Sequence, residues 1–170
     1  MHSIRLARTE DAIAIADVHI ASWRAGYGEL IPADVLDEVL NRREMERRWN
    51  RLLVAPEPPN AQVLLICEGE LVFGYSRFGS SRDMDSILDG DTGEVYGFYL
   101  HPGRWGRGLG RSLMSAVLEA LADQGFRQAT LNVIEANERA RLFYERQGWT
   151  LNTEAVDWYG QPQVRYRIEL

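Results

Sequence analysis

The sequence of 170 residues has a net charge of −6, and all 19 of its basic residues are arginines because lysine is absent. Walker A loops, kinase-type catalytic lysines and Schiff-base enzymes all require a lysine amine and are therefore excluded, while the acidic charge argues against nucleic-acid binding. A hydrophobic content of 45% without an apolar run of membrane-spanning length predicts one domain over residues 1–170 that makes no membrane contact, and the lack of an apolar leader predicts a cytoplasmic protein.

Helices dominate the first sixty residues after one short strand. Ile4–Leu6 alternates apolar and polar residues, as a strand does. Apolar residues then recur at steps of three and four over Ile13–Tyr27, and similar apolar faces follow over Pro32–Leu40 and Met45–Leu53. We therefore predict three helices, followed by a proline-rich loop at 55–60.

The middle of the chain changes to the periodicity of strands. Val63–Cys67 and Leu71–Phe78 are apolar runs joined by a short turn, which predicts an antiparallel hairpin. We predict a further strand over Glu94–Leu100, an amphipathic helix over Leu109–Leu121 and another strand over Ala129–Ile134. A strand, a helix and a strand in this order form a crossover unit, so we expect one parallel strand pair.

The last part of the chain predicts one more helix and a final strand. Asn137 is a suitable N-cap for that helix and Gly148 a suitable end, while Val164–Ile168 alternates as a strand does. The whole therefore reads as a mixed α/β fold. Cys67 is the single cysteine, which excludes an intrachain disulfide and a multi-cysteine metal site, so we expect no metal centre. Its place in a predicted buried strand argues against a role as nucleophile.

The segment between the predicted strand 94–100 and the helix after it is rich in glycine and arginine. Its glycines stand at alternate positions, as Gly106, Gly108 and Gly110. Its arginines are Arg104, Arg107 and Arg111. A glycine backbone before a helix N-terminus suits a phosphate or pyrophosphate, and arginine matches phosphate oxygens. A dinucleotide fingerprint does not fit, because its third glycine would fall at Arg111, and a tight turn without a ligand is the other alternative.

A second distinctive block lies further along the chain. It comprises Leu131–Val133 and Asn137–Trp149. The first block is the glycine-rich segment together with the end of the strand before it, and it comprises Leu100–Pro102 and Trp105–Gly110. In this order the two blocks closely resemble the GNAT superfamily of acyl-CoA-dependent N-acetyltransferases. The resemblance implies a central mixed, mostly antiparallel sheet of about seven strands flanked by helices. It also implies acetyl-CoA as co-substrate and direct attack of a primary amine on the thioester.

The match to the family has two departures. Trp105 stands where the family's loop usually opens with glutamine or arginine. Because the family binds pyrophosphate mainly through backbone amides, this change weakens the resemblance little. Asn132 stands where some members place a glutamate base, so that base is missing here.

The resemblance also implies which residues bind acetyl-CoA. In the family the pantetheine arm pairs with the strand backbone like an added strand, the amide of Leu100 would be the oxyanion donor, and the loop amides hold the pyrophosphate. The residues expected to contact acetyl-CoA are Phe98, Tyr99, Leu100, Arg104, Trp105, Gly106, Arg107, Gly108, Leu109, Gly110, Arg111, Ser112, Asn137 and Tyr144.

Two side chains are implied as catalytic. Tyr144 matches the family's tyrosine in the second block and is expected to protonate the departing thiolate; a core tyrosine is the alternative. Glu94 matches the catalytic glutamate of histone acetyltransferases in the superfamily and is expected to take the proton of the amine, directly or through water. Strand periodicity places Glu94 on one face with Tyr96 and Phe98, and a surface carboxylate at a strand end is the alternative.

The acceptor is less defined by the sequence. Trp23, Tyr27 and Trp49 are candidates for acceptor contact in the family's arrangement, or for core packing. Residues 61–103 contain seven acidic residues and two arginines, and most of these acids lie in one loop, at Asp83, Asp85, Asp89 and Asp91. A solvated loop explains them, or they attract a cationic, polyamine-like small amine. A protein or peptide N-acetyltransferase and a non-catalytic acyl-CoA binding or sensing protein are alternative functions, and a homodimer is left open.

Overall fold

The computed structural model describes residues 1–83, 90–158 and 160–170, and it is built on one seven-stranded sheet. The strand order is β1-β2-β3-β4-β5-β7-β6. Its strands are β1 (Ser3–Leu6), β2 (Gln62–Glu68), β3 (Leu71–Ser80), β4 (Thr92–Leu100), β5 (Gln128–Ile134), β6 (Thr150–Trp158) and β7 (Gln161–Glu169). Within the described residues β4 and β5 pair in parallel and the other neighbours pair antiparallel, which confirms the predicted mostly antiparallel sheet.

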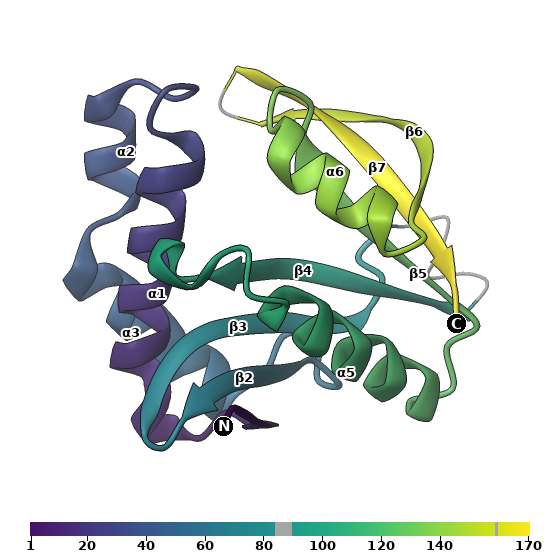
Figure 1. The fold of residues 1–170 in the computed structure, drawn as a ribbon, viewed down its shortest axis with the longest axis horizontal. Coiled ribbons are helices and arrows are strands. Elements are labelled where there is room, and N and C mark those ends of the chain that lie inside the picture. Colours follow the sequence, from purple (N-terminus) through teal and green to yellow (C-terminus); the bar gives the residue numbers. More distant parts are fainter. Residues whose placement is uncertain (84–89, 159) are drawn as a thin grey trace.

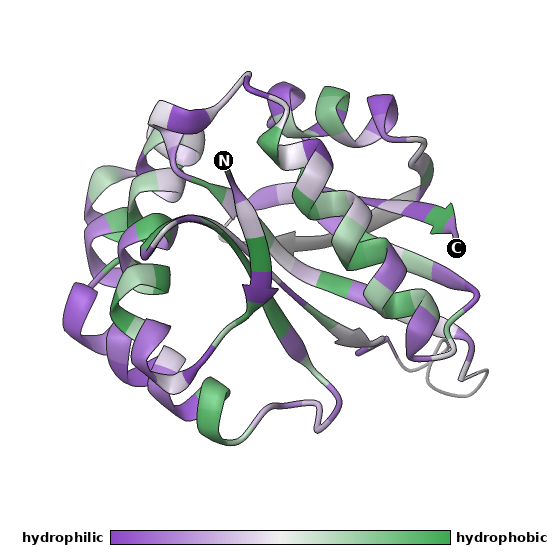
Figure 2. Cartoon of the chain, turned by 60° about the horizontal axis from the view of Figure 1, so that its bottom comes forward, coloured by the Kyte–Doolittle hydropathy of each residue, from purple (hydrophilic) through white to green (hydrophobic). Residues whose placement is uncertain are grey.

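Helices cover both faces of this sheet (Figure 1). The helical segments are the 3-10 turns η1 (Thr9–Asp11) and η2 (Pro102–Arg104) and the helices α1 (Ala12–Tyr27), α2 (Ala33–Val39), α3 (Arg42–Val54), α5 (Leu109–Asp123) and α6 (Glu138–Arg146). The segments α1 to α3 pack on one face, and α5 and α6 pack on the other. In Figure 2 these helices carry hydrophobic and hydrophilic residues together, as helices between a core and water do.

Each layer has its own apolar core. The core beneath α5 and α6 contains the fully buried Leu113, Val117 and Leu121 of α5. The core beneath α1 and α3 contains Ile15 and Trp49. The apolar spacing predicted these faces, because residues three and four apart lie on one side of a helix. Within the described residues no helix combines the length and the apolar character needed to cross a membrane.

Two local signals in the sequence define the ends of α6. Asn137 caps α6, because its side-chain oxygen accepts a hydrogen bond from the Ala140 amide at 3.2 Å, as predicted. Gly148 follows the helix with φ of +89°, a left-handed conformation that glycine adopts without strain. Together they define the ends of α6, whose Tyr144 packs in one core with residues of β5 and β7 (Figure 1).

The sheet opens between β4 and β5. These strands pair from Thr92 opposite Gln128 to Val95 opposite Leu131, and the described pairing ends there although both strands continue. On its other edge β4 contains a bulge against β3, since Arg77 faces Gly97 whereas Phe78 faces Val95. The extra residue is Tyr96. A bulge bends its strand and reverses the alternation of side chains beyond it, so β4 turns away from β5 where the gap begins.

Candidate active site

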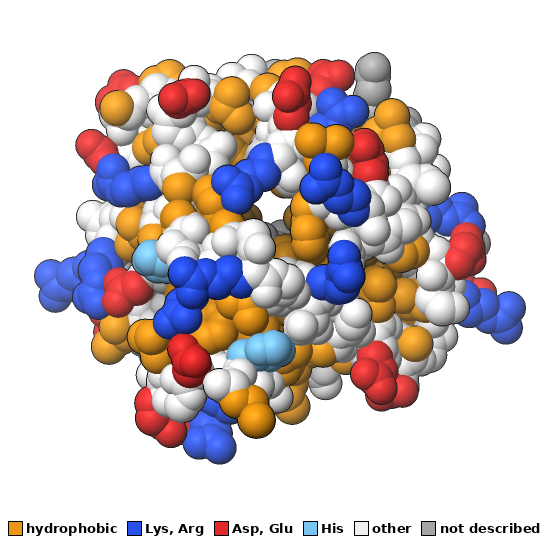
Figure 3. All heavy atoms as spheres, viewed as in Figure 1, with side chains coloured by type: hydrophobic (Ala, Val, Ile, Leu, Met, Phe, Trp, Pro, Cys, Tyr) orange, Lys and Arg blue, Asp and Glu red, His pale blue; other side chains and the backbone are white. Residues whose placement is uncertain are grey.

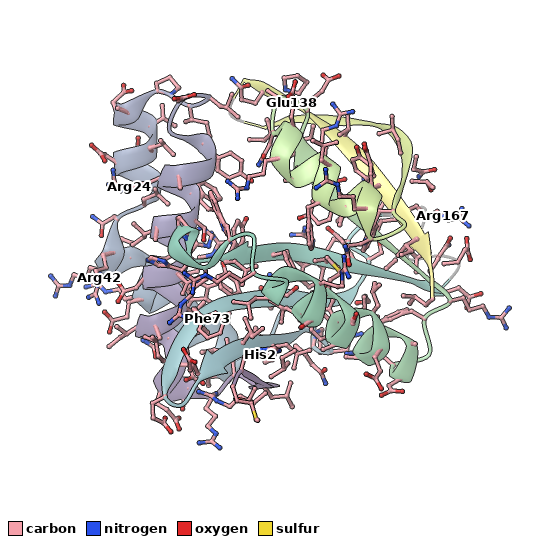
Figure 4. All side chains as sticks on the ribbon, in the orientation of Figure 1. His2, Arg24, Arg42, Phe73, Glu138 and Arg167 are labelled. Carbon is pink, nitrogen blue, oxygen red and sulfur yellow. The ribbon has the colours of Figure 1, made fainter. Side chains whose placement is uncertain are left out.

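A cleft of about 490 Å³ lies at the gap between β4 and β5. Its walls come from β4, the glycine-rich loop, β5, α6 and the end of α1. Figure 3 shows this face of the molecule hollowed near its centre, with arginine side chains around the opening. Figure 4 labels Phe73 on β3 and Glu138 at the start of α6, and neither residue lines the cleft. The cleft therefore joins segments that are far apart in the sequence.

The glycine-rich loop gives the cleft an exposed backbone. Gly106 and Gly108 have φ of +75° and +77°, values that side-chain-bearing residues rarely adopt. Gly108 is the N-cap of α5, and the first turn of a helix has backbone amides without intrahelical partners. At Gly110 an added Cβ would lie 3.1 Å from the Phe143 ring, so glycine also permits the close approach of α5 to α6. This geometry suits an anionic group such as a pyrophosphate.

Trp105, the departure from the family pattern, fixes the start of this loop. Its Nε1 donates to the Leu100 carbonyl at 2.8 Å, and Ser22 Oγ of α1 donates to the same oxygen at 2.8 Å. Across the cleft, the Arg139 guanidinium of α6 stacks over the Trp105 ring at 3.9 Å. The tryptophan therefore links the end of β4, the loop and α6, a role that its position alone did not indicate.

Most of the residues expected to contact acetyl-CoA line this cleft. They are Phe98, Tyr99, Leu100, Arg104, Trp105, Gly106, Gly108, Gly110, Arg111, Asn137 and Tyr144. The lining does not include Arg107, Leu109 or Ser112. Arg107 is exposed, whereas Leu109 is buried in the core beneath α5. Arg104 also pairs with Glu68 at 3.3 Å, so its charge is partly engaged within the protein.

Tyr144 is buried at the wall of the cleft on α6. Burial, and then the neighbouring Tyr99, raise the pKa of its phenol. The group therefore keeps its proton at neutral pH, as an acid catalyst must before the reaction. The Tyr144 ring also packs edge-on against Phe143 and Trp149. Tyr144 is therefore both a core residue and a residue of the cleft wall.

A second cavity of about 380 Å³ lies on the α1–α3 side of β4. Both cavities are lined by Tyr27, Val95, Tyr96, Gly97, Tyr99, Asn132 and Val133. The residues of the gap in the sheet are thus common to both. Trp23, Tyr27 and Trp49 pack in or against the core of that layer and also line the second cavity, and their contact with an acceptor stays a prediction.

Because of the bulge, the prediction that Phe98 shares a face with Glu94 and Tyr96 is wrong for Phe98. Glu94, Tyr96 and Tyr99 line the second cavity, but Phe98 does not. Instead Phe98 stacks on Phe143 of α6 at 5.5 Å on the opposite face of the sheet. Simple alternation failed because the additional residue, Tyr96, moves every later side chain of β4 to the other face.

Glu94 is a buried carboxylate and not a surface group, with 6% of the residue exposed. It accepts the backbone amide of Arg82 at 2.8 Å and the Arg82 Nη2 at 2.5 Å. The Arg82 guanidinium also lies over the Tyr96 ring at 4.5 Å. A buried charge requires such partners, and here the partner belongs to the segment that leads away from β3.

His19 is a feature of the second cavity that the sequence analysis missed. Its ring lies on the inner face of α1, stacks on Trp23 at 4.8 Å and makes a short hydrogen bond through Nδ1 with the Tyr75 hydroxyl. Burial, and then the positive charge of Arg48, lower the pKa of His19 to about 3. The ring is therefore neutral at physiological pH. A histidine on an apolar helix face was the available signal.

The acidic loop is only partly described. Asp85 and Asp89 lie outside the described residues. Asp83 forms an ion pair with Arg165 of β7, and Asp91 is exposed with Arg127 at 3.8 Å. Cys67 is fully buried and lines neither cavity, and burial raises the pKa of its thiol, which agrees with the expected inertness.

Known proteins resemble the chain in sequence and in fold. The Acetyltransferase (GNAT) family matches residues 17–149. The uncharacterized N-acetyltransferase YuaI of Bacillus subtilis is 35% identical over 147 residues, which are 85% of this chain and 78% of that protein. The L-amino acid N-acyltransferase MnaT of Escherichia coli is 26% identical over 152 residues, 89% of this chain and 81% of that protein. The solved structure of yncA from Salmonella typhimurium with its cofactor acetyl-CoA has a TM-score of 0.73 at 20% identity, covering 99% and 94% of the two chains.

The neutral, buried His19 predicts a pH-dependent stability. Unfolding returns its pKa from about 3 to the ordinary 6.5, so below pH 6.5 the unfolded chain binds a proton that the folded chain does not. The unfolding free energy should therefore fall by about 1 kcal/mol per pH unit between pH 6 and pH 5 because of this group. Urea denaturation at several pH values should show a smaller slope for His19→Asn. His2→Asn, at the exposed end of the chain (Figure 4), should keep the wild-type slope, and equal slopes for all three proteins would contradict the assignment.

Proposed function

The chain belongs to the Acetyltransferase (GNAT) family, and we propose that it transfers the acetyl group of acetyl-CoA to a small primary amine. The observation that carries this proposal is the pair of cavities that meet at the gap between β4 and β5. One cavity ends at the glycine loop and a helix N-terminus, which suits a pyrophosphate. The other is enclosed by aromatic and charged side chains and contains a buried carboxylate, which suits an amine.

The free edge of β4 would bind the pantetheine arm. The backbone of Phe98, Tyr99 and Leu100 pairs with β3 on one side. On the other side the described pairing of β4 with β5 has already ended, at Val95. Backbone groups on that edge can therefore pair with the amides of an extended ligand, as an added strand would. The amide of Leu100 is the proposed donor to the thioester oxygen, where negative charge develops during attack.

Two side chains would move protons during the transfer. The amine nitrogen bonds to the thioester carbonyl carbon and loses a proton to Glu94, directly or through water. The carbon–sulfur bond then breaks, and Tyr144 gives its proton to the sulfur. The two groups lie in different cavities that meet at the gap, so each is on the side where its proton is needed.

A small acceptor agrees better with the site than a protein does. A volume of about 380 Å³ suits a small molecule, and MnaT, a relative, is an L-amino acid N-acyltransferase by name. The polyamine hypothesis rested on the acidic loop. Within the described residues its aspartates Asp83 and Asp91 lie beside arginines and do not line the second cavity.

We expect acetyl-CoA to be consumed in the presence of an amine. Release of free CoA thiol should be measured across a panel of small amines, amino acids, polyamines and peptides, with the thermal shift by acetyl-CoA as a parallel binding assay. The proposal predicts a thermal shift together with amine-dependent thiol release. A shift without release for any acceptor would indicate a binding or sensing protein, and release with peptides alone would indicate the protein acetyltransferase alternative.

Replacing Tyr144 with phenylalanine should slow the reaction and leave cofactor binding intact. Tyr144→Phe removes one hydroxyl from a buried ring, so kcat should fall by about 10- to 1000-fold, as expected for loss of an acid catalyst. The thermal shift by acetyl-CoA serves as the control and should match that of the wild type. An unchanged kcat at saturating substrate would exclude Tyr144 from the mechanism and support the core alternative.

Glu94→Gln tests the proposed base. The amide can still accept hydrogen bonds from Arg82 but cannot take a proton from the amine at neutral pH, so kcat/KM should fall by about 100-fold or more. The wild-type profile of kcat/KM should depend on pH, and the variant should lose the dependence due to this base. Glu70→Gln in the exposed turn between β2 and β3 is the matched control. Flat and equal profiles for wild type and Glu94→Gln would refute the role.

A further inference from the structure

Resting on the proposed acetyltransferase activity, we propose that the second cavity binds an amine that also carries a carboxylate, as an α-amino acid does. In this arrangement Arg48 and Arg77 bind the carboxylate, and the amine points toward Glu94 and the gap in the sheet. The acceptor is thus recognised at both ends, and neither a polyamine nor a simple alkylamine fits equally well.

The charge of the cavity carries this inference. Its described lining contains three guanidinium groups, those of Arg48, Arg77 and Arg82, and a single carboxylate, that of Glu94. The whole chain has a net charge of −6, so the cavity is opposite in sign to the protein around it. A local excess of positive charge in a recess raises the concentration of anions there. The same field repels a polycation.

Two of these arginines lack a carboxylate partner within the described part of the chain. Arg82 pairs with Glu94, but no ion pair of the described residues includes Arg48 or Arg77. Arg77 donates to the backbone carbonyl of Glu57 and stacks over Tyr96 at 4.8 Å, which positions the guanidinium without neutralising it. Burial first, and then the charges of Arg82 and Arg48, lower the pKa of Arg77, as expected where positive groups gather.

Arg48 of α3 lines the same cavity as His19, Trp23 and Trp49. Its positive charge lowers the pKa of His19, after the larger effect of burial. The residue itself is exposed, which places Arg48 at the boundary between the cavity and solvent. A guanidinium in such a position can form two parallel hydrogen bonds to a carboxylate at little cost in desolvation.

The approach to the cavity is also basic. A wide groove of about 1310 Å³ shares Arg48, Leu52, Arg77 and Arg82 with the second cavity. Arg51 adds a further positive charge to the groove, and Glu57 is the acidic residue of its described lining. An acceptor that enters by this route passes the arginines before it reaches Glu94, so its anionic group would remain near Arg48 and Arg77 while its amine goes deeper.

The test compares acceptors that differ only in the acidic group. L-Amino acids that support thiol release should each be assayed beside their amides and decarboxylated amines, with spermidine as the polycation. We expect kcat/KM to favour the carboxylate in the wild type. Arg48→Gln should lower kcat/KM for the amino acid by about 10- to 100-fold, as loss of a charged hydrogen-bonded pair does, and change that for the amide by less than about threefold.

Arg47→Gln provides the matched control on the same helix. Arg47 pairs with Glu44 at 2.6 Å and lines neither the cavity nor the groove, so its loss should leave every acceptor unaffected. Equal effects of Arg48→Gln on acid and amide, or faster use of amines without an acidic group, would overturn the inference and leave the acetyltransferase activity standing. Absence of thiol release with every amine would instead refute the proposed function on which the inference rests.

Discussion

The separation of β4 from β5 is the constraint on which the site depends. Parallel pairing holds the strands together from Thr92 to Val95, and the bulge at Tyr96 then turns β4 away. A sheet that stayed closed would bury these backbone groups in its own ladder and would separate the two faces. Because it opens, one edge of β4 is free to pair with a ligand, and the cavities on its two faces come into contact.

The bulge also distributes side chains between the two faces. Beyond Tyr96, Phe98 turns to α6 and Tyr99 turns to α1, so the wall of each cavity is set by a single extra residue. On the α6 face the proposed ligand-binding groups are mainly backbone amides at glycines. On the α1 face the proposed groups are side chains, with guanidinium groups near solvent and a buried carboxylate. A long phosphorylated ligand and a small charged amine could thus bind mainly on opposite faces of the sheet and meet at the gap, whose residues line both cavities.

The sequence was sufficient for most of the elements, although its periodicity did not predict β6, and for half of the site. The helical apolar spacing, the Asn137 cap and the glycine loop are local patterns, and each was found where it was predicted. The bulge has no comparable local signal, which is why Phe98 was assigned to the wrong face. The pairing of Glu94 with Arg82 and the shared cavity of Arg48 and His19 depend on how separate segments pack. The extent of the domain and the catalytic roles of Tyr144 and Glu94 stay predictions.

Hydrogen exchange of the protein with and without acetyl-CoA reports which backbone amides the ligand covers, and so shows whether the open sheet is the cofactor site. We expect slower exchange at residues 98–100 on the free edge of β4 and at 106–111 in the glycine loop. The hairpin of β6 and β7 should be unchanged, since none of its described residues lines the cleft between β4 and β5. Protection confined to other segments, with none at β4 or the loop, would contradict the proposal that the open sheet is the cofactor site.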